Sequence, residues 1–250
     1  MENTNFAVDV FGKAVLDYQW GNYTEDILTF SSLDEKDIIP LPYLFRDFDN
    51  MPLLEQKALD LCKGKVLDIG CGAGSHSLYL QGKGLSVTAL DSSKGAIETC
   101  GLRGIKNSIH TDIYSFKGPK FDTLLLLMNG IGLAGRLNQL GKFLEHLKLL
   151  LKPNGHILLD SSDIIYMFQE DDDGGHWIPD TDTYYGEVEF TMTYKNIKSK
   201  PFPWLYLDYN SLERAAFYHN LNCKLVSQGE HYDYLAKLSL KRQQISTSFV

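Results

Sequence analysis

The sequence predicts a doubly wound α/β sheet, and three observations support this fold class. Short apolar runs alternate with helical patterns between about residues 65 and 160. One run, Phe121–Met128 (FDTLLLLM), is apolar nearly throughout, as expected of a central strand covered by helices on both faces. Gly70, Gly72 and Gly74 separate the first strand pattern from the first helix pattern. Ligands of such sheets bind beyond the carboxyl ends of the strands, where this glycine turn lies.

The individual elements follow from apolar periodicity and from the residues that interrupt it. Strands are expected at Lys65–Ile69, Leu85–Leu90, Ile105–Thr111, Phe121–Met128 and His156–Asp160, and helices at Ser75–Gln81, Gly95–Arg103 and Arg136–Lys152. The last of these helices places leucine and phenylalanine at helical spacing, and Pro153-Asn154-Gly155 is expected to stop it before the next strand.

Composition limits the classes of protein that remain. At 250 residues and 44% hydrophobic content, the chain can bury the core of one domain with additions. No segment reaches the roughly 18 uncharged apolar residues of a membrane span, and the amino terminus lacks a secretory signal pattern. The four cysteines form no CxxC pair and suggest neither a metal site nor an oxidising compartment, so a cytoplasmic protein is expected. A net charge of -8 disfavours nucleic acid as a partner.

The glycine turn predicts a nucleotide-like ligand. Missing side chains let a ligand approach the backbone, and free N–H groups at the start of the helix face it. Asp91 ends the next strand 21 residues after Gly70 (91 − 70), near the spacing of about 20 residues at which an acidic side chain binds a ribose diol. A dinucleotide motif would place its third small residue at Ser75, whereas this sequence has Gly74.

The stretch VLDIGCGAG, Val66–Gly74, resembles the first motif of the class I S-adenosylmethionine-dependent methyltransferases. The resemblance extends over Lys65–Asp160 and toward the carboxyl terminus. Within it LLKPNGHILL, Leu150–Leu159, is similar to the turn into the family's fifth strand. The stretch HYDYLAKLSLKR is similar to its last, antiparallel strand. The resemblance therefore implies a Rossmann-like, mostly parallel seven-stranded sheet with an antiparallel last strand.

The same resemblance implies that S-adenosyl-L-methionine is the cofactor, and we expect the methyl acceptor to be a small molecule. The residues it places at the cofactor are Asp68, Gly70, Cys71, Gly72, Gly74, Asp91, Ser92, Asp112, Ile113, Met128 and Asn129. Asp91 would hold the ribose and Asp112 would lie near the adenine amine.

The sequence does not identify a catalytic residue. The Asn/Asp-Pro-Pro-Tyr/Phe motif of many enzymes that methylate base amines or glutamine amides is replaced here by Met128-Asn129-Gly130. A direct displacement needs alignment more than it needs a catalytic side chain. His76, Asp163 and Tyr18 are candidate bases, and packing, capping or solvent exposure explains each of them at least as well. A nicotinamide-dependent oxidoreductase and a non-catalytic S-adenosylmethionine-binding protein remain as alternatives.

Two regions lie outside the core pattern. Residues 1–62 are expected to form a lid that contains a helix at Leu53–Leu61, before a cofactor-binding domain at residues 63–250. Tyr18, Trp20, Tyr43 and Arg46 are the lid's candidate acceptor-pocket residues, with core packing as the alternative. Within an insertion at about residues 161–208, the alternating run Val188–Tyr194 is expected to pair with Phe202–Leu207 across the turn at residues 198–200. A helix near Asn210 follows, with Asn210 and Glu213 as its capping pair.

The insertion is also strongly acidic. No lysine or arginine lies between Lys152 and Lys195, where ten acidic residues fall. Such a field would favour a small, neutral or cationic acceptor, whereas the alternative is a solvated loop that contributes only solubility. Asp171–Asp173 with Asp180 resembles a calcium loop, but Gln169 stands at the first ligand position and the bidentate glutamate is absent. No metal is expected.

Overall fold

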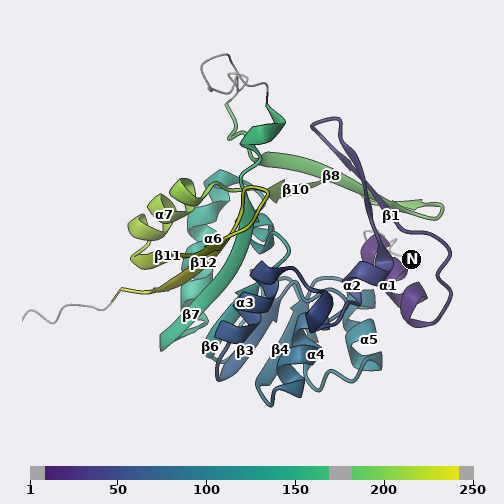
Figure 1. The fold of residues 1–250 in the computed structure, drawn as a ribbon, viewed down its shortest axis with the longest axis horizontal. Helices are drawn as coiled ribbons and strands as arrows, with labels where there is room; N and C mark the ends of the chain where they lie inside the picture. Colours follow the sequence, from purple (N-terminus) through teal and green to yellow (C-terminus); the bar gives the residue numbers. More distant parts are fainter. Residues whose placement is uncertain (1–8, 169–181, 242–250) are drawn as a thin grey trace, which may run out of the picture.

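The larger of two sheets carries the fold predicted from the sequence (Figure 1). The computed structural model describes residues 9–168 and 182–241. The order of the seven strands is β11-β12-β7-β6-β3-β4-β5, and only β12 runs antiparallel to the rest. The strands are β3 (Lys65–Ile69), β4 (Ser86–Asp91), β5 (Ser108–His110), β6 (Phe121–Leu126), β7 (Leu151–Ser162), β11 (Leu221–Gln228) and β12 (Asp233–Leu240). The predicted doubly wound sheet with its antiparallel last strand is confirmed.

Helices cover both faces of this sheet. The helices are α3 (Leu53–Leu61), α4 (Ser75–Gly82) and α5 (Lys94–Leu102) on one face, and α6 (Leu137–Leu149) and α7 (Tyr209–Tyr218) on the other. Packing on both faces of β6 explains its unbroken apolar sequence. Leu124 and Leu126 pack toward α6, while Leu125 and Leu127, which directly follows the strand, pack toward α3. None of the helices in residues 9–168 and 182–241 could cross a membrane.

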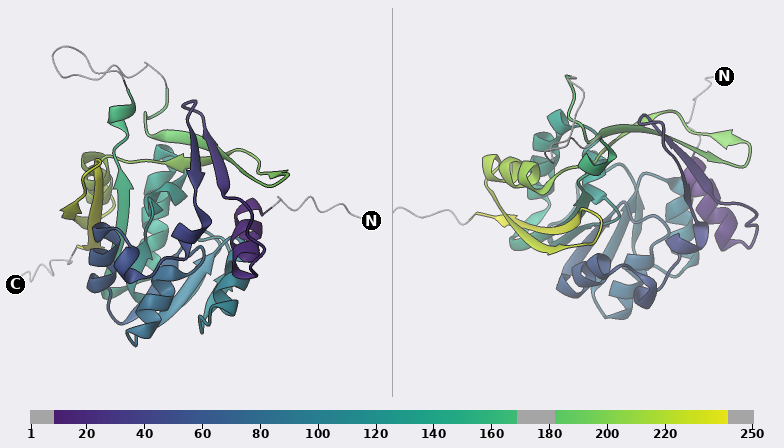
Figure 2. Two further views of the ribbon diagram at one scale, coloured as in Figure 1. Left: turned by 45° about the vertical axis from the view of Figure 1, so that its right-hand side comes forward. Right: turned by 45° about the horizontal axis from the view of Figure 1, so that its top comes forward.

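The second sheet joins two regions that are far apart in sequence. Its order is β10-β8-β1-β2, all antiparallel. Its strands are β1 (Ile27–Ser31), β2 (Lys36–Ile39), β8 (Glu187–Tyr194) and β10 (Phe202–Leu205), with the short β9 (Ile197–Lys198) beside β8. Figure 2 shows this sheet arching over one end of the larger sheet. The predicted pairing of β8 with β10 is confirmed, but the turn after β8 lies at residues 195–196 and not at 198–200, because Lys198 of β9 still pairs with Thr193. The amino-terminal hairpin that extends the sheet was not predicted.

The pairing of β1 with β8 joins the amino-terminal region to the insertion. It comprises α1 (Val10–Gln19), the β1–β2 hairpin, α2 (Leu41–Leu44), a 3-10 turn η1 (Phe48–Asn50) and α3. The helix predicted at Leu53–Leu61 is confirmed with the same bounds. Strand β1 belongs to the predicted cap and β8 to the predicted cofactor-binding domain, yet the two strands pair in one sheet. The division of the chain at residue 62 therefore stays a prediction.

Three local predictions are wrong, for identifiable reasons. Pro153-Asn154-Gly155 lies inside β7 as an irregularity, because Phe121 pairs with Leu151 and Thr123 pairs with His156. The strand expected at residues 105–111 is only Ser108–His110. Helix α7 is capped by Asp208, whose side chain accepts the Ser211 N–H, rather than by Asn210 with Glu213. Strand β11 was not predicted.

Gly74 provides a test of the turn into α4. Its φ is +83°, and a Cβ there would lie 2.3 Å from Ile105 Cδ1 and 2.9 Å from Cys100 Sγ. Gly74→Ala should lower the free energy of unfolding in urea by about 2–4 kcal/mol through strain and overpacking. Gly101→Ala is the control, because a Cβ at this helical position meets nothing within 4 Å. The control should be neutral or stabilising by up to about 1 kcal/mol, and equal losses in both variants would contradict this account.

Candidate functional site

The glycine turn is fixed to the end of the neighbouring strand. The N–H groups of Gly70 and Cys71 donate to the Leu90 carbonyl oxygen at 2.8 and 3.1 Å. The Gly72 N–H donates to Asp91 Oδ2 at 2.9 Å. Both glycines have positive φ, +74° for Gly70 and +54° for Gly72. Residues that carry a Cβ rarely adopt this backbone conformation. The turn between β3 and α4 and the acid that ends β4 therefore form one unit.

Asp91 can bind a further ligand. Its Oδ1 accepts the Ser93 N–H at 2.8 Å, so each carboxylate oxygen already holds one backbone donor. A carboxylate has about four acceptor sites, and two remain for hydroxyl donors such as a ribose diol. Burial raises the pKa of Asp91, while the two backbone hydrogen bonds oppose that shift.

Helix α1 lies over this unit. The Phe11 ring is 3.4 Å from the position that a Cβ on Gly72 would occupy. Asp9, the N-cap of α1, accepts the Gly12 N–H at 2.8 Å, the Ser93 hydroxyl at 2.9 Å and the Gly95 N–H at 3.0 Å. One carboxylate thus joins the starts of α1 and α5 beside Asp91. The sequence predicts a lid here, but no sequence pattern singles out Asp9 or Phe11.

The other residues predicted from the first motif differ in exposure. Asp68 is 2% exposed and accepts the Ser77 hydroxyl at 2.6 Å, so its side chain supports the turn from inside. Cys71 is also buried, with its sulfur 3.7 Å from that of Cys100. Only the backbone of Cys71 is placed to face a ligand.

The residues predicted after β4 and β5 lie at the same sheet edge. Ser92 is exposed, and its carbonyl oxygen accepts a hydrogen bond from His110 Nε2 at 3.0 Å. The Asp112 carboxylate is exposed and accepts the Tyr114 N–H, whereas Ile113 is buried in the main core. Of this pair, only Asp112 offers a side chain to a ligand.

The turn after β6 is held in an unusual conformation. Met128 and Asn129 are consecutive non-glycine residues with positive φ, +64° and +57°. Asp160, at the end of β7, accepts the N–H groups of Met128 and Gly130, both at 3.0 Å. Asn129 Oδ1 accepts the Ser161 hydroxyl at 2.8 Å. Burial raises the pKa of Asp160 to about 6, although the Gly130 hydrogen bond works against that shift.

A cavity of about 730 Å³ adjoins this turn. Met128 and Asn129 line it from the turn after β6, and the facing wall comes from the second sheet. Alternate residues of β8 and β10 face inward, since their side chains share one side of that sheet: Val188, Phe190 and Met192, with Phe202 and Trp204. The volume is typical of a small-molecule site. The sequence could not locate this cavity, because the pairing of β1 with β8 builds it.

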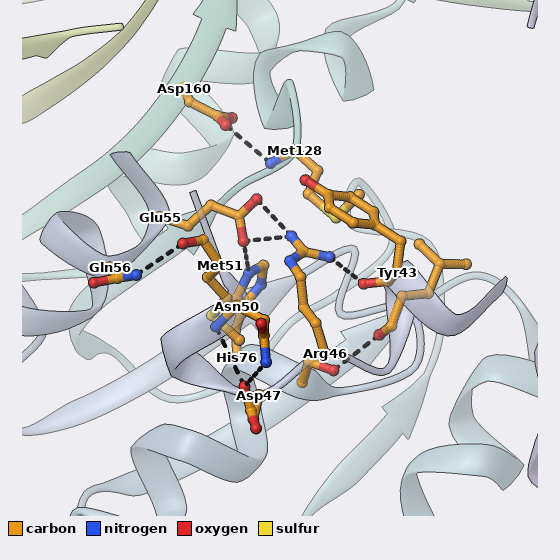
Figure 3. A network of polar contacts seen from close by, with 12 residues as sticks. Tyr43, Arg46, Asp47, Asn50, Met51, Glu55, Gln56, His76, Met128 and Asp160 are labelled. Carbon is orange, nitrogen blue, oxygen red and sulfur yellow. Dashed lines mark hydrogen bonds and ion pairs between the residues drawn. The ribbon is translucent and has the colours of Figure 1, made fainter. Parts of the chain in front are cut away.

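A buried charged network joins the amino-terminal region to α4 (Figure 3). Arg46 forms an ion pair with Glu55 of α3, and Glu55 Oε2 lies 2.7 Å from His76 Nε2 of α4. The Arg46 guanidinium also lies over the Tyr43 ring, 3.9 Å from its centroid. Burial opposes ionisation of Glu55, but hydrogen bonds from His76 and Arg46 outweigh it and lower its pKa.

None of the three candidate bases lines the cavity as the structure describes it. His76 is 7% exposed and bonded to Glu55. Asp163 accepts the Ile165 N–H at 2.9 Å and the Tyr185 hydroxyl at 2.8 Å. Tyr18 packs against Phe45, with ring centroids 4.4 Å apart.

The lid's candidate acceptor-pocket residues do not line the cavity. Trp20 is 59% exposed, whereas Arg46 is buried in the charged network. The acidic run Asp171–Asp173 and Asp180, weighed as a calcium loop, lies outside the described residues.

Fold and site together define a Rossmann-like α/β protein, a class whose ligands bind beyond the carboxyl ends of the strands. A family model described as a methyltransferase domain matches residues 67–159. A crystal structure of a SAM-dependent methyltransferase from Bacteroides fragilis, in complex with S-adenosyl-L-homocysteine, is 40% identical in sequence with a TM-score of 0.87. The alignment covers 94% of this chain and 95% of that one. The chain belongs to the S-adenosylmethionine-dependent methyltransferases, which sets aside the nicotinamide-dependent alternative.

More distant relatives share part of the sequence or the fold. A ubiquinone biosynthesis O-methyltransferase of Rickettsia typhi is 29% identical over 107 residues. That match covers 41% of this chain and 42% of the relative, so it spans less than half of either protein. A methyltransferase structure from Clostridium acetobutylicum, 15% identical with a TM-score of 0.54, covers 78% of this chain and 94% of its own, and shows the fold alone.

The raised pKa of Asp160 predicts a pH-dependent stability. With a pKa of about 6 when folded against 3.8 ordinarily, Asp160 holds a proton between about pH 4 and 6 that the unfolded chain releases. Its contribution to stability is present at low pH and is lost as the pH rises through about 6. Relative to Asp160→Asn, the wild type should therefore lose up to about 3 kcal/mol of unfolding free energy over this window. A difference between the two proteins that stays constant from pH 4 to 8 would show that Asp160 titrates normally.

Proposed function

We propose that S-adenosylmethionine binds at the glycine turn with its ribose on Asp91 and transfers its methyl group to a small molecule in the adjoining cavity. The observation that carries this proposal is the Asp91 carboxylate, fixed by Gly72 and Ser93 with acceptor sites to spare. The open faces of Gly70 and Gly72 allow close approach, since a Cβ there would meet only side chains at 3.4 Å or more. The exposed Asp112 carboxylate suits the adenine amine.

The buried network supplies a cationic group for the amino-acid end of the cofactor. Arg46 Nε is buried and has no hydrogen-bond partner among the described residues. An unpaired donor on a buried guanidinium is costly, and a ligand carboxylate would satisfy it. Glu55 and His76 would hold Arg46 in place while fixing the amino-terminal region to α4.

Bound S-adenosylmethionine supplies an electrophilic methyl group on a sulfonium. A lone pair on the acceptor oxygen or amine would form the new bond to the methyl carbon as the carbon–sulfur bond breaks, leaving S-adenosylhomocysteine, and the proton of the acceptor group would pass to water. The chain's own contribution is alignment and exclusion of water: α1 covers the glycine turn, and the Met128–Asn129 turn fixes the boundary with the cavity.

The proposed acceptor is small and neutral or cationic. The cationic possibility depended on the acidic insertion, yet several of its carboxylates already have partners. Glu187 and Glu189 form ion pairs with Arg136, and Asp163 accepts two hydrogen bonds. Activity is tested by measuring S-adenosylhomocysteine formation with a library of metabolites. Turnover on RNA or DNA alone would contradict a small-molecule acceptor.

Asp91→Ala tests the ribose site. The loss of hydrogen bonds from the ribose hydroxyls to a charged acceptor should weaken S-adenosylhomocysteine binding by about 1.5–3 kcal/mol, measured by calorimetry. Glu98→Ala on the exposed face of α5 is the matched control and should bind as the wild type does. Unchanged affinity of the Asp91 variant would place the ribose elsewhere.

Trypsin cleavage after Lys13 tests whether α1 covers the cofactor. The Lys13 side chain is 51% exposed, but Lys13 lies within helix α1. Cleavage there therefore requires α1 to open locally. Saturating S-adenosylhomocysteine should slow this cleavage at least about tenfold, because a ligand beneath Phe11 opposes opening. Cleavage after Lys142, on α6 of the opposite sheet face, is the internal reference. Equal protection at both sites would indicate global stabilisation instead of a lid.

A further inference from the structure

The cavity beside the Met128–Asn129 turn has an aromatic wall. Phe190 of β8 and Phe202 and Trp204 of β10 line it together. Phe190 and Phe202 are directly paired across the two strands, with ring centroids 6.3 Å apart. Phe202 and Trp204 meet edge to face at 6.4 Å. Flat apolar faces of this kind favour a ring-shaped ligand.

Trp204 is packed against the 3-10 turn that follows β6. A Cβ on Gly132, in the 3-10 turn η2 (Gly130–Ala134), would lie 2.1 Å from Trp204 Nε1. The indole therefore occupies the space that any other residue at position 132 would fill. This contact holds the aromatic wall beside Met128, where the reaction would occur.

The wall presents no charged side chain to the cavity. Glu187 and Glu189 alternate with Val188 on β8, so they lie on the other face of the sheet, where Arg136 pairs with both. The charged lining residues are confined to the β1–β2 hairpin: Glu35, Lys36 and Asp37. A charged ligand at the aromatic wall would lose hydration, and no charged side chain of the wall itself would replace it.

One polar group on this side of the cavity is free. Tyr206 follows β10 and lines the cavity, and its hydroxyl has no hydrogen-bond partner among the described residues. Burial raises the pKa of Tyr206 to about 12, so the phenol stays a neutral donor. Tyr206 can therefore donate a hydrogen bond to an uncharged oxygen of a ligand.

We propose that the methyl acceptor is an uncharged aromatic hydroxy compound, with its ring against Phe190, Phe202 and Trp204 and an oxygen bonded to Tyr206. This proposal rests on the proposed function and names the substrate class of the same site. In the transfer, an oxygen–methyl bond forms, the sulfur–methyl bond breaks and the hydroxyl proton passes to water.

Three matched probes test the charge preference. Calorimetry of the full chain saturated with S-adenosylhomocysteine would compare 1-naphthol, 1-naphthoate and 1-naphthylmethylammonium. The neutral naphthol should bind at least about tenfold more tightly than either ion, because only the ions must shed their hydration. Equal or tighter binding of an ion would overturn the proposal.

Two pairs of variants locate the binding site. Trp204→Ala should weaken naphthol binding about tenfold or more, whereas Trp20→Ala, at an exposed tryptophan outside the cavity, should not change it. Tyr206→Phe should weaken it about three- to tenfold, with the exposed Tyr218→Phe as control. Trp204→Phe, which keeps an aromatic ring, serves if the alanine variant does not fold.

S-adenosylhomocysteine binding separates this proposal from the proposed function. Each cavity variant should bind S-adenosylhomocysteine as the wild type does. Wild-type protein that fails to bind it would overturn the proposed function. Normal binding of S-adenosylhomocysteine, combined with naphthol affinities that the Trp204 and Tyr206 variants leave unchanged, would overturn the acceptor assignment alone.

Discussion

The Asp160 carboxylate holds together the part of the structure on which the proposed chemistry depends. By accepting the N–H groups of Met128 and Gly130, it stabilises two consecutive left-handed residues that would otherwise cost about 1–2 kcal/mol each. The same turn reaches the second sheet, because Asn129 Nδ2 donates to the Leu205 carbonyl oxygen at 3.2 Å. The end of β6 is therefore the point at which the two sheets meet and the cavity begins.

The proposed site of the methyl donor and the proposed cavity of the methyl acceptor are held in shape by different kinds of contact. On the donor side, backbone groups dominate: the glycine turn and Asp91 are joined by N–H bonds, and Asp9 fastens α1 above them. On the acceptor side, side-chain packing dominates, with Trp204 set against Gly132. Such a division suits a family in which the cofactor is constant while the acceptor varies, since packing surfaces can change without disturbing the backbone turn.

The sequence predicted what is local and missed what is long-range. The strand, glycine turn, helix and strand from Lys65 to Asp91 were predictable, because each boundary carries its own apolar or glycine signal. The second sheet was predicted only for β8 and β10. Strands β1 and β8 lie more than 150 residues apart in the sequence, so no local pattern indicates that they pair. Strand β2, which completes the hairpin with β1, is mostly exposed and carries no alternating apolar pattern. The cavity and the role of Asp160 depend on that pairing and on the β6–β7 register, so they required the structure.

The central claim is that the transferable methyl group faces the cavity at Met128. Nuclear Overhauser measurements with methyl-¹³C S-adenosylmethionine and protein labelled at its methionine methyl groups would test this directly. Met128 lines the cavity, whereas Met51 is buried in the core beneath α3 and serves as an internal control. We expect a contact between the cofactor methyl and the Met128 methyl, and none with Met51. Saturated binding without the Met128 contact, or with a contact to Met51, would contradict the account.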